Sequence, residues 1–237
     1  LNNNMLWFES CDSTMDICHR FASFHKENLI IGSSKQISGR GTKNRLWVSP
    51  EGNLYLSILI FPQNRHIQTL HMIGAITILK LLQSEFGQSP SIKWPNDIII
   101  DGKKICGVLQ ENVFENQKLE YSIIGIGLNV NMENNFKIDI PYTSIKLSTS
   151  KSIDVKKLGK KVSNLFFNYY LSDLTDQEIT NIWIENIDTV GKKIRLSLLN
   201  GSYLEGEVVA IDNNGDLVLK TKNDENKIIK SGMVQKM

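Results

Sequence analysis

The sequence predicts an α+β fold, with a mixed central sheet flanked by helices and a small β-barrel at the C-terminal end. The first observation is a series of apolar runs that alternate with a period of two, as strands do, around two long segments of helical spacing. The second is a set of short strand-like runs joined by tight turns beyond residue 190. At 237 residues and 41% hydrophobic content, the chain can bury such a core. We therefore expect one domain at 1–188 and a smaller one at 189–237.

Hydroxyl side chains mark the start of the first predicted helix. Up to residue 90 we expect an edge strand at 6–9, a helix at 15–24, strands at 28–34 and 53–61, and a helix at 65–86 that ends at Gly87. Ser13 and Thr14 precede the first helix, where hydroxyl groups cap the free N–H groups of the first turn. On the residues alone, capping is favoured over ligand binding.

A basic loop with two glycines occupies residues 35–47. Gly39 and Gly41 permit backbone conformations that other residues resist, while Arg40, Lys43 and Arg45 bring three positive charges to one loop. Such a loop can surround a phosphate or a carboxylate with backbone N–H donors and cations. A solvated surface loop is the alternative, and the glycines alone do not exclude it.

The segment after residue 90 predicts a hairpin with charges on facing strands. Pro95 has no N–H to donate, so it ends a short strand. Asp101-Gly102 is typical of a two-residue hairpin turn, and the residues after it alternate back along the partner strand. We therefore expect Lys104 to lie near Asp97, an arrangement that is rare on a half-buried sheet without a function.

A further strand at 120–130 carries two glycines on one face. Gly125 and Gly127 remove side chains from that face and leave room for a ligand against the backbone, and Asn129 there can hydrogen-bond a nucleotide. A close crossing of two strands is the alternative interpretation. Beyond it we expect an irregular stretch at 131–151, one or two helices within 154–186, strands at 193–199, 203–211, 217–221 and 227–229, and turns at Asn200-Gly201 and Asn213-Asn214-Gly215.

Composition excludes several classes of protein. A net charge of +2 is too small to indicate nucleic-acid binding, which needs clustered lysine and arginine. No apolar run reaches the length of a membrane-spanning helix and no signal-peptide core begins the chain, so we expect a cytoplasmic protein with no membrane partner. Cys11, Cys18 and Cys106 lack the pairing of a disulfide frame or a zinc site, and we expect no protein-bound metal.

Three motifs in order resemble those of biotin protein ligases. They are Gly39-Arg40-Gly41 followed by Arg45 and Trp47, then Lys93-Trp94-Pro95-Asn96-Asp97 with Lys104 and Gly107, then Gly125, Gly127 and Asn129. The resemblance implies a class II synthetase-like catalytic domain at 1–188 and an SH3-like barrel at 189–237. It also implies a possible homodimer formed through an exposed sheet edge.

The resemblance assigns roles residue by residue. Biotin contacts are implied for Ser13, Thr14, Gln36, Gly39, Arg40, Lys104, Gly107, Gly125 and Gly127. ATP contacts are implied for Arg40, Lys43, Arg45, Trp47, Lys93, Asn96 and Asn129. Catalysis is implied for Lys104, Asp97 and Arg40, with Trp47 either an adenine platform or a core residue.

The implied reaction explains the need for cations. Biotin is activated by ATP as an acyl-adenylate and then joined to a lysine of the biotin carboxyl carrier protein of acetyl-CoA carboxylase. Attack of a carboxylate on the α-phosphorus brings two anions together, so fixed positive charge and Mg²⁺ on the pyrophosphate are expected. Thr42 departs from the arginine that many family members carry, which predicts weaker retention of the intermediate.

Two other functions remain open at this level. A lipoate protein ligase shares the fold and the chemistry, and a non-catalytic module could hold an anion in the basic loop. A ligase that also represses transcription needs an additional N-terminal DNA-binding domain. Because the catalytic pattern begins at Leu6, we expect no DNA partner.

Overall fold

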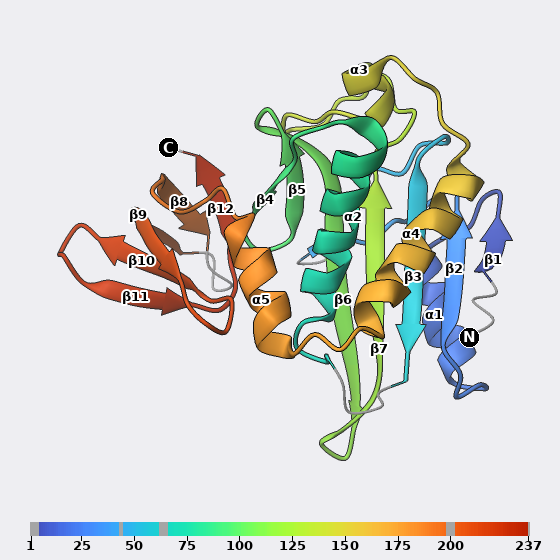
Figure 1. Ribbon diagram of the computed structural model, residues 1–237, viewed down its shortest axis with the longest axis horizontal. Helices are drawn as coiled ribbons and strands as arrows, with labels where there is room; N and C mark the ends of the chain where they lie inside the picture. Colours follow the sequence, from blue (N-terminus) through green and yellow to red (C-terminus); the bar gives the residue numbers. More distant parts are fainter. Residues whose placement is uncertain (1–4, 43–44, 62–65, 198–201, 237) are drawn as a thin grey trace.

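The computed structural model describes residues 5–42, 45–61, 66–197 and 202–236 and contains two sheets (Figure 1). The larger has seven strands in the order β1-β2-β3-β7-β6-β5-β4, of which only the β1–β2 pair is parallel. Its strands are β1 (Met5–Phe8), β2 (Leu29–Ser33), β3 (Leu54–Ile60), β4 (Ser91–Lys93), β5 (Asp97–Ile100), β6 (Lys103–Glu115) and β7 (Lys118–Leu128). The predicted mixed central sheet is therefore confirmed.

Helices cover the two faces of this sheet unequally. They are α1 (Thr14–Ala22), α2 (Leu70–Phe86), α3 (Ile145–Thr149), α4 (Val155–Tyr170) and α5 (Asp176–Glu185). The face carrying Leu54, Leu56 and Ile58 of β3 packs into the main core with α2 and α4. On the opposite face, Leu59 and Ile123 pack only with α1 and its neighbours in a smaller cluster. Side chains alternate between the two faces along a strand. Since α1 is the helix that packs on the second face, part of that face is open and can hold a site.

The hairpin between β5 and β6 forms as the sequence predicted. Asp101 and Gly102 both have positive φ, 50° and 74°, which a tight two-residue turn requires. The register pairs Asp97 with Gly107, and an irregularity between Ile98 and Ile99 brings Ile99 opposite Lys104. The strand after the turn runs to Glu115, further than the alternating residues indicated.

Helix positions differ from expectation in two places. The second helix begins at Leu70 rather than 65, and it ends at Gly87 in the left-handed conformation as predicted. The stretch 131–151, expected to be irregular, contains α3, which is capped by the Ser144 hydroxyl. The Ser144 hydroxyl oxygen accepts the N–H of Leu147 in the first turn, which is a local signal for the start of a helix.

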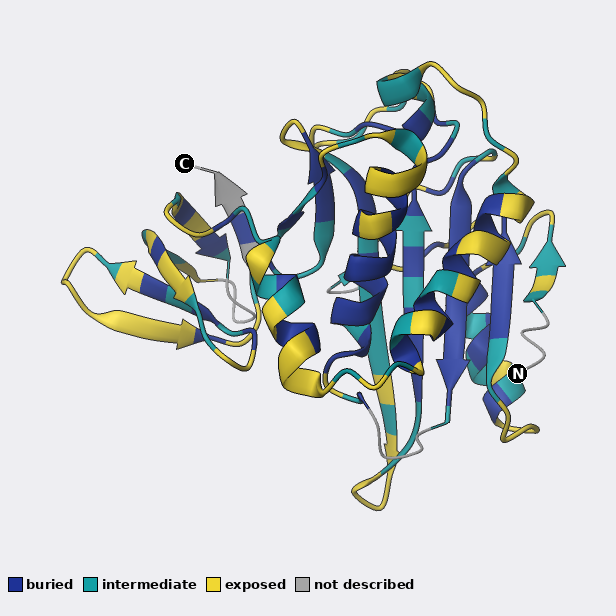
Figure 2. Cartoon of the chain, viewed as in Figure 1, coloured by how far each residue is buried: buried dark blue, intermediate teal, exposed yellow. Residues whose placement is uncertain are grey.

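The C-terminal part is an open sheet rather than the predicted closed barrel. Its strands are β8 (Lys193–Ser197), β9 (Tyr203–Ile211), β10 (Leu217–Thr221), β11 (Asn226–Ile229) and β12 (Met233–Lys236), in the order β11-β10-β9-β8-β12. No pairing joins β11 to β12 among the described residues. Buried residues of this sheet, such as Leu196 and Leu217, belong to the main core cluster, so closure is not needed to bury them. Figure 2 shows β11 as mostly exposed.

One tryptophan joins the two sheets. The Trp94 backbone N–H donates to the Thr189 hydroxyl over 3.0 Å, and its Nε1–H donates to the Gly215 carbonyl over 2.9 Å. Trp94 is 2% exposed, and Gly215 has φ of +83°. The predicted turn at Asn200-Gly201 lies outside the described residues, and the division at residue 188 stays a prediction. None of the described helices is long and apolar enough to cross a membrane.

Candidate active site

A cavity of about 1040 Å³ lies on the α1 face of the large sheet and extends to the C-terminal sheet. Its floor is formed by β3, β5, β6 and β7, and its walls come from the 36–48 loop and the 137–142 segment. Ile194 and Val234 of the C-terminal sheet close one end. The cavity therefore draws on every part of the chain that carries a sequence motif.

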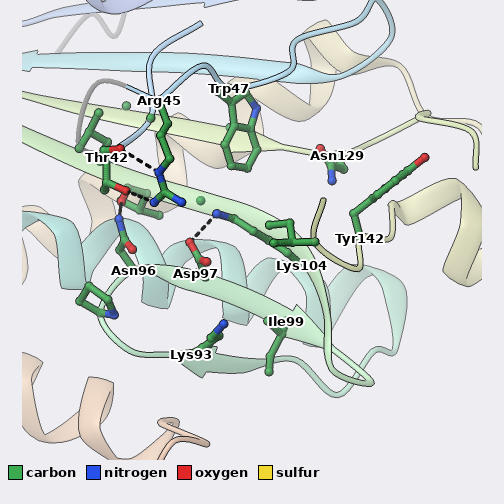
Figure 3. Close-up of a pocket in the computed structure, with 18 of the residues that line it drawn as sticks. Thr42, Arg45, Trp47, Lys93, Asn96, Asp97, Ile99, Lys104, Asn129 and Tyr142 are labelled. Carbon is green, nitrogen blue, oxygen red and sulfur yellow. Dashed lines mark hydrogen bonds and ion pairs between the residues drawn. The ribbon is translucent and has the colours of Figure 1, made fainter. Parts of the chain in front are cut away.

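Lys104 is the central cation of this cavity. Its Nζ lies 2.6 Å from Asp97 Oδ1 and 4.8 Å from the centroid of the Trp47 ring. Figure 3 shows Lys104 pointing toward Asp97, with Trp47 beside the ammonium group. The side chains of Lys104 and Asp97 are 18% and 24% exposed, so the pair is partly desolvated. The expected proximity of Lys104 and Asp97 is confirmed.

The glycines of the floor make room for the Trp47 ring. Gly107 of β6 pairs with Gly127 of β7. On the outer sides of this pair, Asp97 of β5 pairs with Gly107 and Tyr55 of β3 pairs with Gly127. A Cβ at Gly127 would lie 2.6 Å from the Trp47 ring, and one at Gly107 would lie 2.8 Å from it. Neither distance is tolerated, so glycine is required at both positions for the indole to lie on the sheet.

The opposite end of the cavity is polar and closely packed. Gln36 Oε1 accepts two hydrogen bonds from Thr14, one from the backbone N–H over 2.9 Å and one from the hydroxyl over 3.1 Å. The Thr14 hydroxyl oxygen also lies 2.8 Å from the Ser57 hydroxyl oxygen. Met15 lies over Gly125, where a Cβ would meet the thioether sulfur at 2.8 Å. Thr14 and Gln36 thus form one hydrogen-bonded unit. Ser57 was not predicted, because a single serine in an apolar strand gives no signal of its own.

Arg40 lines the cavity but is bonded to two carboxylates. Its Nη1 lies 2.8 Å from Asp16 Oδ1, and its Nη2 lies 2.8 Å from Glu111 Oε1. Glu111 Oε2 in turn lies 3.0 Å from His19 Nε2. The positive charge of Arg40 is therefore balanced locally by two carboxylates, and its predicted contact with an anionic substrate stays a prediction.

The second arginine of the loop folds back onto Thr42. The Arg45 Nη2 donates to the Thr42 hydroxyl over 2.8 Å, and its Nε donates to the Thr42 carbonyl over 3.2 Å (Figure 3). Both residues line the cavity. Lys43, predicted to contact ATP, lies outside the described residues.

The two asparagines of the motifs bind backbone groups of neighbouring segments. Asn96 Nδ2 donates to the Val108 carbonyl over 2.6 Å and thereby joins the β4–β5 turn to β6. Asn129 is 5% exposed, and its Nδ2 donates to the Thr143 carbonyl over 3.0 Å. Asn96, Asn129 and Lys93 all line the cavity. The two asparagine hydrogen bonds therefore fix the positions of backbone segments that form its wall.

Of the predicted site residues that the structure describes, Ser13 and Gly39 do not line the cavity, and several lining residues were not predicted. Ser13 is the N-cap of α1, its hydroxyl accepting the Asp16 N–H over 3.4 Å. Gly39 is buried where a Cβ would lie 2.3 Å from the Ser49 hydroxyl oxygen. Unpredicted lining residues include Met15, Ser57, Tyr142, Asp188, Thr189, Lys192 and Gly232. Those beyond 188 carry no motif, so only the folded arrangement identifies them.

Burial changes the chemistry of two groups around the site. Desolvation raises the pKa of Tyr55, whose hydroxyl donates to the Pro50 carbonyl over 2.9 Å. Desolvation likewise raises the pKa of the Cys106 thiol, so this cysteine stays protonated and unreactive. Within the described residues no group of three potential metal-binding side chains occurs.

Family models match both parts of the chain. The model of the biotin/lipoate A/B protein ligase family matches residues 7–129, and that of the biotin protein ligase C-terminal domain matches residues 189–237. Among curated relatives, the bifunctional ligase/repressor BirA of Bacillus subtilis is 30% identical over 96% of this chain and 73% of its own length. A biotin–acetyl-CoA-carboxylase ligase of Paracoccus denitrificans is 24% identical over 78% of this chain and 81% of its own.

Solved structures agree with these matches. The biotin protein ligase of Aquifex aeolicus, in complex with biotin and ATP, superimposes with a TM-score of 0.77 and 26% identity. That likeness covers 98% of this chain and 97% of the Aquifex chain. Motif order, cavity geometry, family models and relatives thus lead to one conclusion. This chain belongs to the biotin protein ligase family.

Proposed function

We propose that this protein activates biotin with ATP as biotinyl-5′-AMP, releasing pyrophosphate, and then transfers biotin to a lysine of a biotin carboxyl carrier protein. The observation that carries the proposal is Lys104, held between Asp97 and Trp47 over a glycine floor in a cavity large enough for both substrates. Family membership supports the same chemistry.

The first step joins two anions. A carboxylate oxygen of biotin forms a bond to the α-phosphorus, and the bond from that phosphorus to the bridging oxygen breaks as pyrophosphate leaves. In this proposal Lys104, which lines the cavity and is partly buried, lies beside the carboxylate and the α-phosphate, where its charge offsets their repulsion. We assign biotin recognition to the Thr14–Gln36 end of the cavity. Nucleotide contact is assigned to Arg40, Arg45, Trp47, Lys93, Asn96 and Asn129, with Lys43 a further candidate.

The second step forms the amide. The neutral amine of the acceptor lysine attacks the acyl carbon, the carbon–oxygen bond to AMP breaks, and the amine loses a proton. Asp97 is the proposed group that orients the acceptor amine or receives this proton, since it is the carboxylate paired with Lys104. The two partners of one ion pair therefore serve different steps in this proposal, Lys104 the first and Asp97 the second.

Mg²⁺ would be held chiefly by the phosphates and would screen the charge of the departing pyrophosphate. The carrier is expected to be that of acetyl-CoA carboxylase, in line with the Paracoccus relative. Formation of a homodimer through an exposed sheet edge, a cytoplasmic location and absence of DNA binding remain predictions. The division of the chain into two domains at residue 188 is likewise still a prediction.

ATP–pyrophosphate exchange tests the proposal directly. Exchange should require biotin and should not occur with lipoate, and labelled biotin should then appear on a carrier domain that retains its acceptor lysine. Exchange driven by lipoate would favour the lipoate ligase. Absence of exchange with either acid would favour a non-catalytic binding module.

A further inference from the structure

An ionic cluster lies beside the cavity and joins three elements that are distant in sequence. Arg40 belongs to the loop between β2 and β3, Asp16 to the first turn of α1, and Glu111 to the middle of β6. Both Arg40 contacts measure 2.8 Å. The arginine therefore ties the basic loop to a helix and to the sheet at the same time.

The cluster continues into the protein through His19. Glu111 Oε2 lies 3.0 Å from His19 Nε2, and His19 Nδ1 lies 3.1 Å from the Tyr121 hydroxyl. Tyr121 packs in turn against Phe61, with ring centroids 5.8 Å apart. Glu111 is thus held from both sides, so it presents a fixed carboxylate to Arg40 rather than a mobile surface charge.

The loop that Arg40 anchors forms the wall above the reacting groups. The Gly41 N–H donates to the Arg45 carbonyl over 2.8 Å, and the Trp47 N–H donates to the Gly39 carbonyl over 2.9 Å. These bonds fold the loop on itself but do not attach it to the body of the protein. Trp47, at the end of the loop, is the residue that lies beside the Lys104 ammonium. Movement of the loop would therefore displace one wall of the cavity.

Exposure decides how strong the cluster is. The side chains of Arg40, Asp16 and Glu111 are 36%, 45% and 24% exposed. Partly exposed ion pairs contribute modestly, yet two charge-assisted hydrogen bonds on one guanidinium restrict its geometry more than a single pair does. The cluster can thus hold Arg40, and with it the described part of the loop, against α1 and β6.

We infer that Asp16 and Glu111 are positioning residues that clamp the described loop residues, 39–42 and 45–47, over the cavity through Arg40, and that they set how long the acyl-adenylate is retained. The retention part rests on the proposed function, whereas the clamp itself does not. Neither carboxylate needs to touch the reacting atoms. In this chain Arg45 hydrogen-bonds Thr42 within the loop, whereas Arg40 forms an ion pair with Glu111 on the sheet.

Glu111→Gln and Asp16→Asn test the clamp in the full-length chain. Each variant keeps the size of its side chain and removes its charge, and Arg40→Lys keeps the charge but loses the forked geometry. Glu120→Gln is the matched control. Glu120 lies on β7, its carboxylate is 2.9 Å from Lys26 Nζ, and it does not line the cavity. Thermal unfolding of each variant identifies any that is globally destabilised.

Two measurements separate the clamp from the proposed function. Hydrogen exchange without substrates should be about threefold to fivefold faster at the Gly41 and Trp47 amides in either carboxylate variant, and unchanged in the control. With biotin and ATP, the ratio of bystander-protein labelling to carrier labelling should rise by a similar factor. Arg40→Lys should give an intermediate value for both.

Unchanged loop exchange in both Glu111→Gln and Asp16→Asn would overturn the clamp. A bystander ratio equal to that of Glu120→Gln would overturn its effect on retention of the acyl-adenylate. Failure of the proposed function has a different signature, namely no biotin-dependent pyrophosphate exchange in the unmodified protein. The hydrogen-exchange comparison remains decisive for the clamp in that case.

Discussion

The ammonium of Lys104 and the carboxylate of Asp97 form an ion pair of 2.6 Å across a two-residue turn. The pair lies in the cavity wall, with the Trp47 ring on another side of the ammonium. A lysine held in this way cannot swing into bulk water without leaving a carboxylate partly buried and unpaired. The position of the charge is therefore set before substrates bind.

Replacement of Lys104 by alanine should depress adenylate formation by about a hundredfold, because one preorganised charge in a water-poor site is lost. ATP–pyrophosphate exchange measures this step without the carrier. Lys103→Ala is the control, since Lys103 is exposed and does not line the cavity. Equal exchange rates in the two variants would remove Lys104 from the mechanism.

Asp97→Asn should affect the second step more than the first. Loss of the carboxylate removes the proposed orienting group for the acceptor amine, and we expect transfer to the carrier to fall about a hundredfold. Exchange should fall by less, because Lys104 keeps its charge. Single-turnover transfer from preformed adenylate measures the difference. Asp101→Asn in the turn serves as control, and a larger loss in exchange than in transfer would contradict the assignment.

Thr42→Arg should improve retention of the intermediate. An arginine there adds a cation to the cavity wall that could pair with the adenylate phosphate, so bystander labelling should fall severalfold. Ser38→Arg adds the same charge to an exposed position of this loop outside the cavity and should have no such effect. If the original protein labels bystanders no more than Thr42→Arg does, Thr42 is not a point of weakness.

Trp94→Phe should loosen the contact between the two sheets. The change removes the donor to the Gly215 carbonyl, a buried hydrogen bond of 2.9 Å. We expect a loss of about 1 kcal/mol in the free energy of unfolding, or roughly 2–4 °C in Tm. Calorimetry or circular dichroism measures it. Tyr203→Phe, on the exposed side of β9, should leave the Tm unchanged.

Acid should destabilise the fold partly through His71. Desolvation lowers the pKa of His71, which packs against Trp183 with ring centroids 6.1 Å apart. The unfolded chain then binds a proton more readily, so the stability contributed by His71 is present above about pH 6.5 and is lost as the pH falls toward the lower folded pKa. Denaturant unfolding from pH 7 to pH 5 should show a shallower loss in His71→Gln. Identical slopes would contradict this account.

Much of the site could be predicted because its signals are local. The Asp101-Gly102 turn and the alternation of the strands determine that Lys104 returns toward Asp97, since pairing across a tight turn follows from the nearest residues. Gly125 and Gly127 were expected to leave room for a ligand on the sheet, yet in the structure Met15 lies above Gly125 and the Trp47 ring lies above Gly127. The motif spacing cannot specify which side chain occupies such a space.

By itself the sequence determined the order of the large-sheet strands along the chain, the helix caps at Ser13 and Gly87, the hairpin that brings Lys104 to Asp97, and the family resemblance. The tertiary structure alone decided that Arg40 is bonded to Asp16 and Glu111, that Trp94 reaches Gly215, and that the C-terminal sheet stays open while forming a cavity wall. The physical reason is the range of the interactions. Turns and caps depend on neighbouring residues, whereas these contacts form only when the packing of distant faces offsets the entropy of closing long loops.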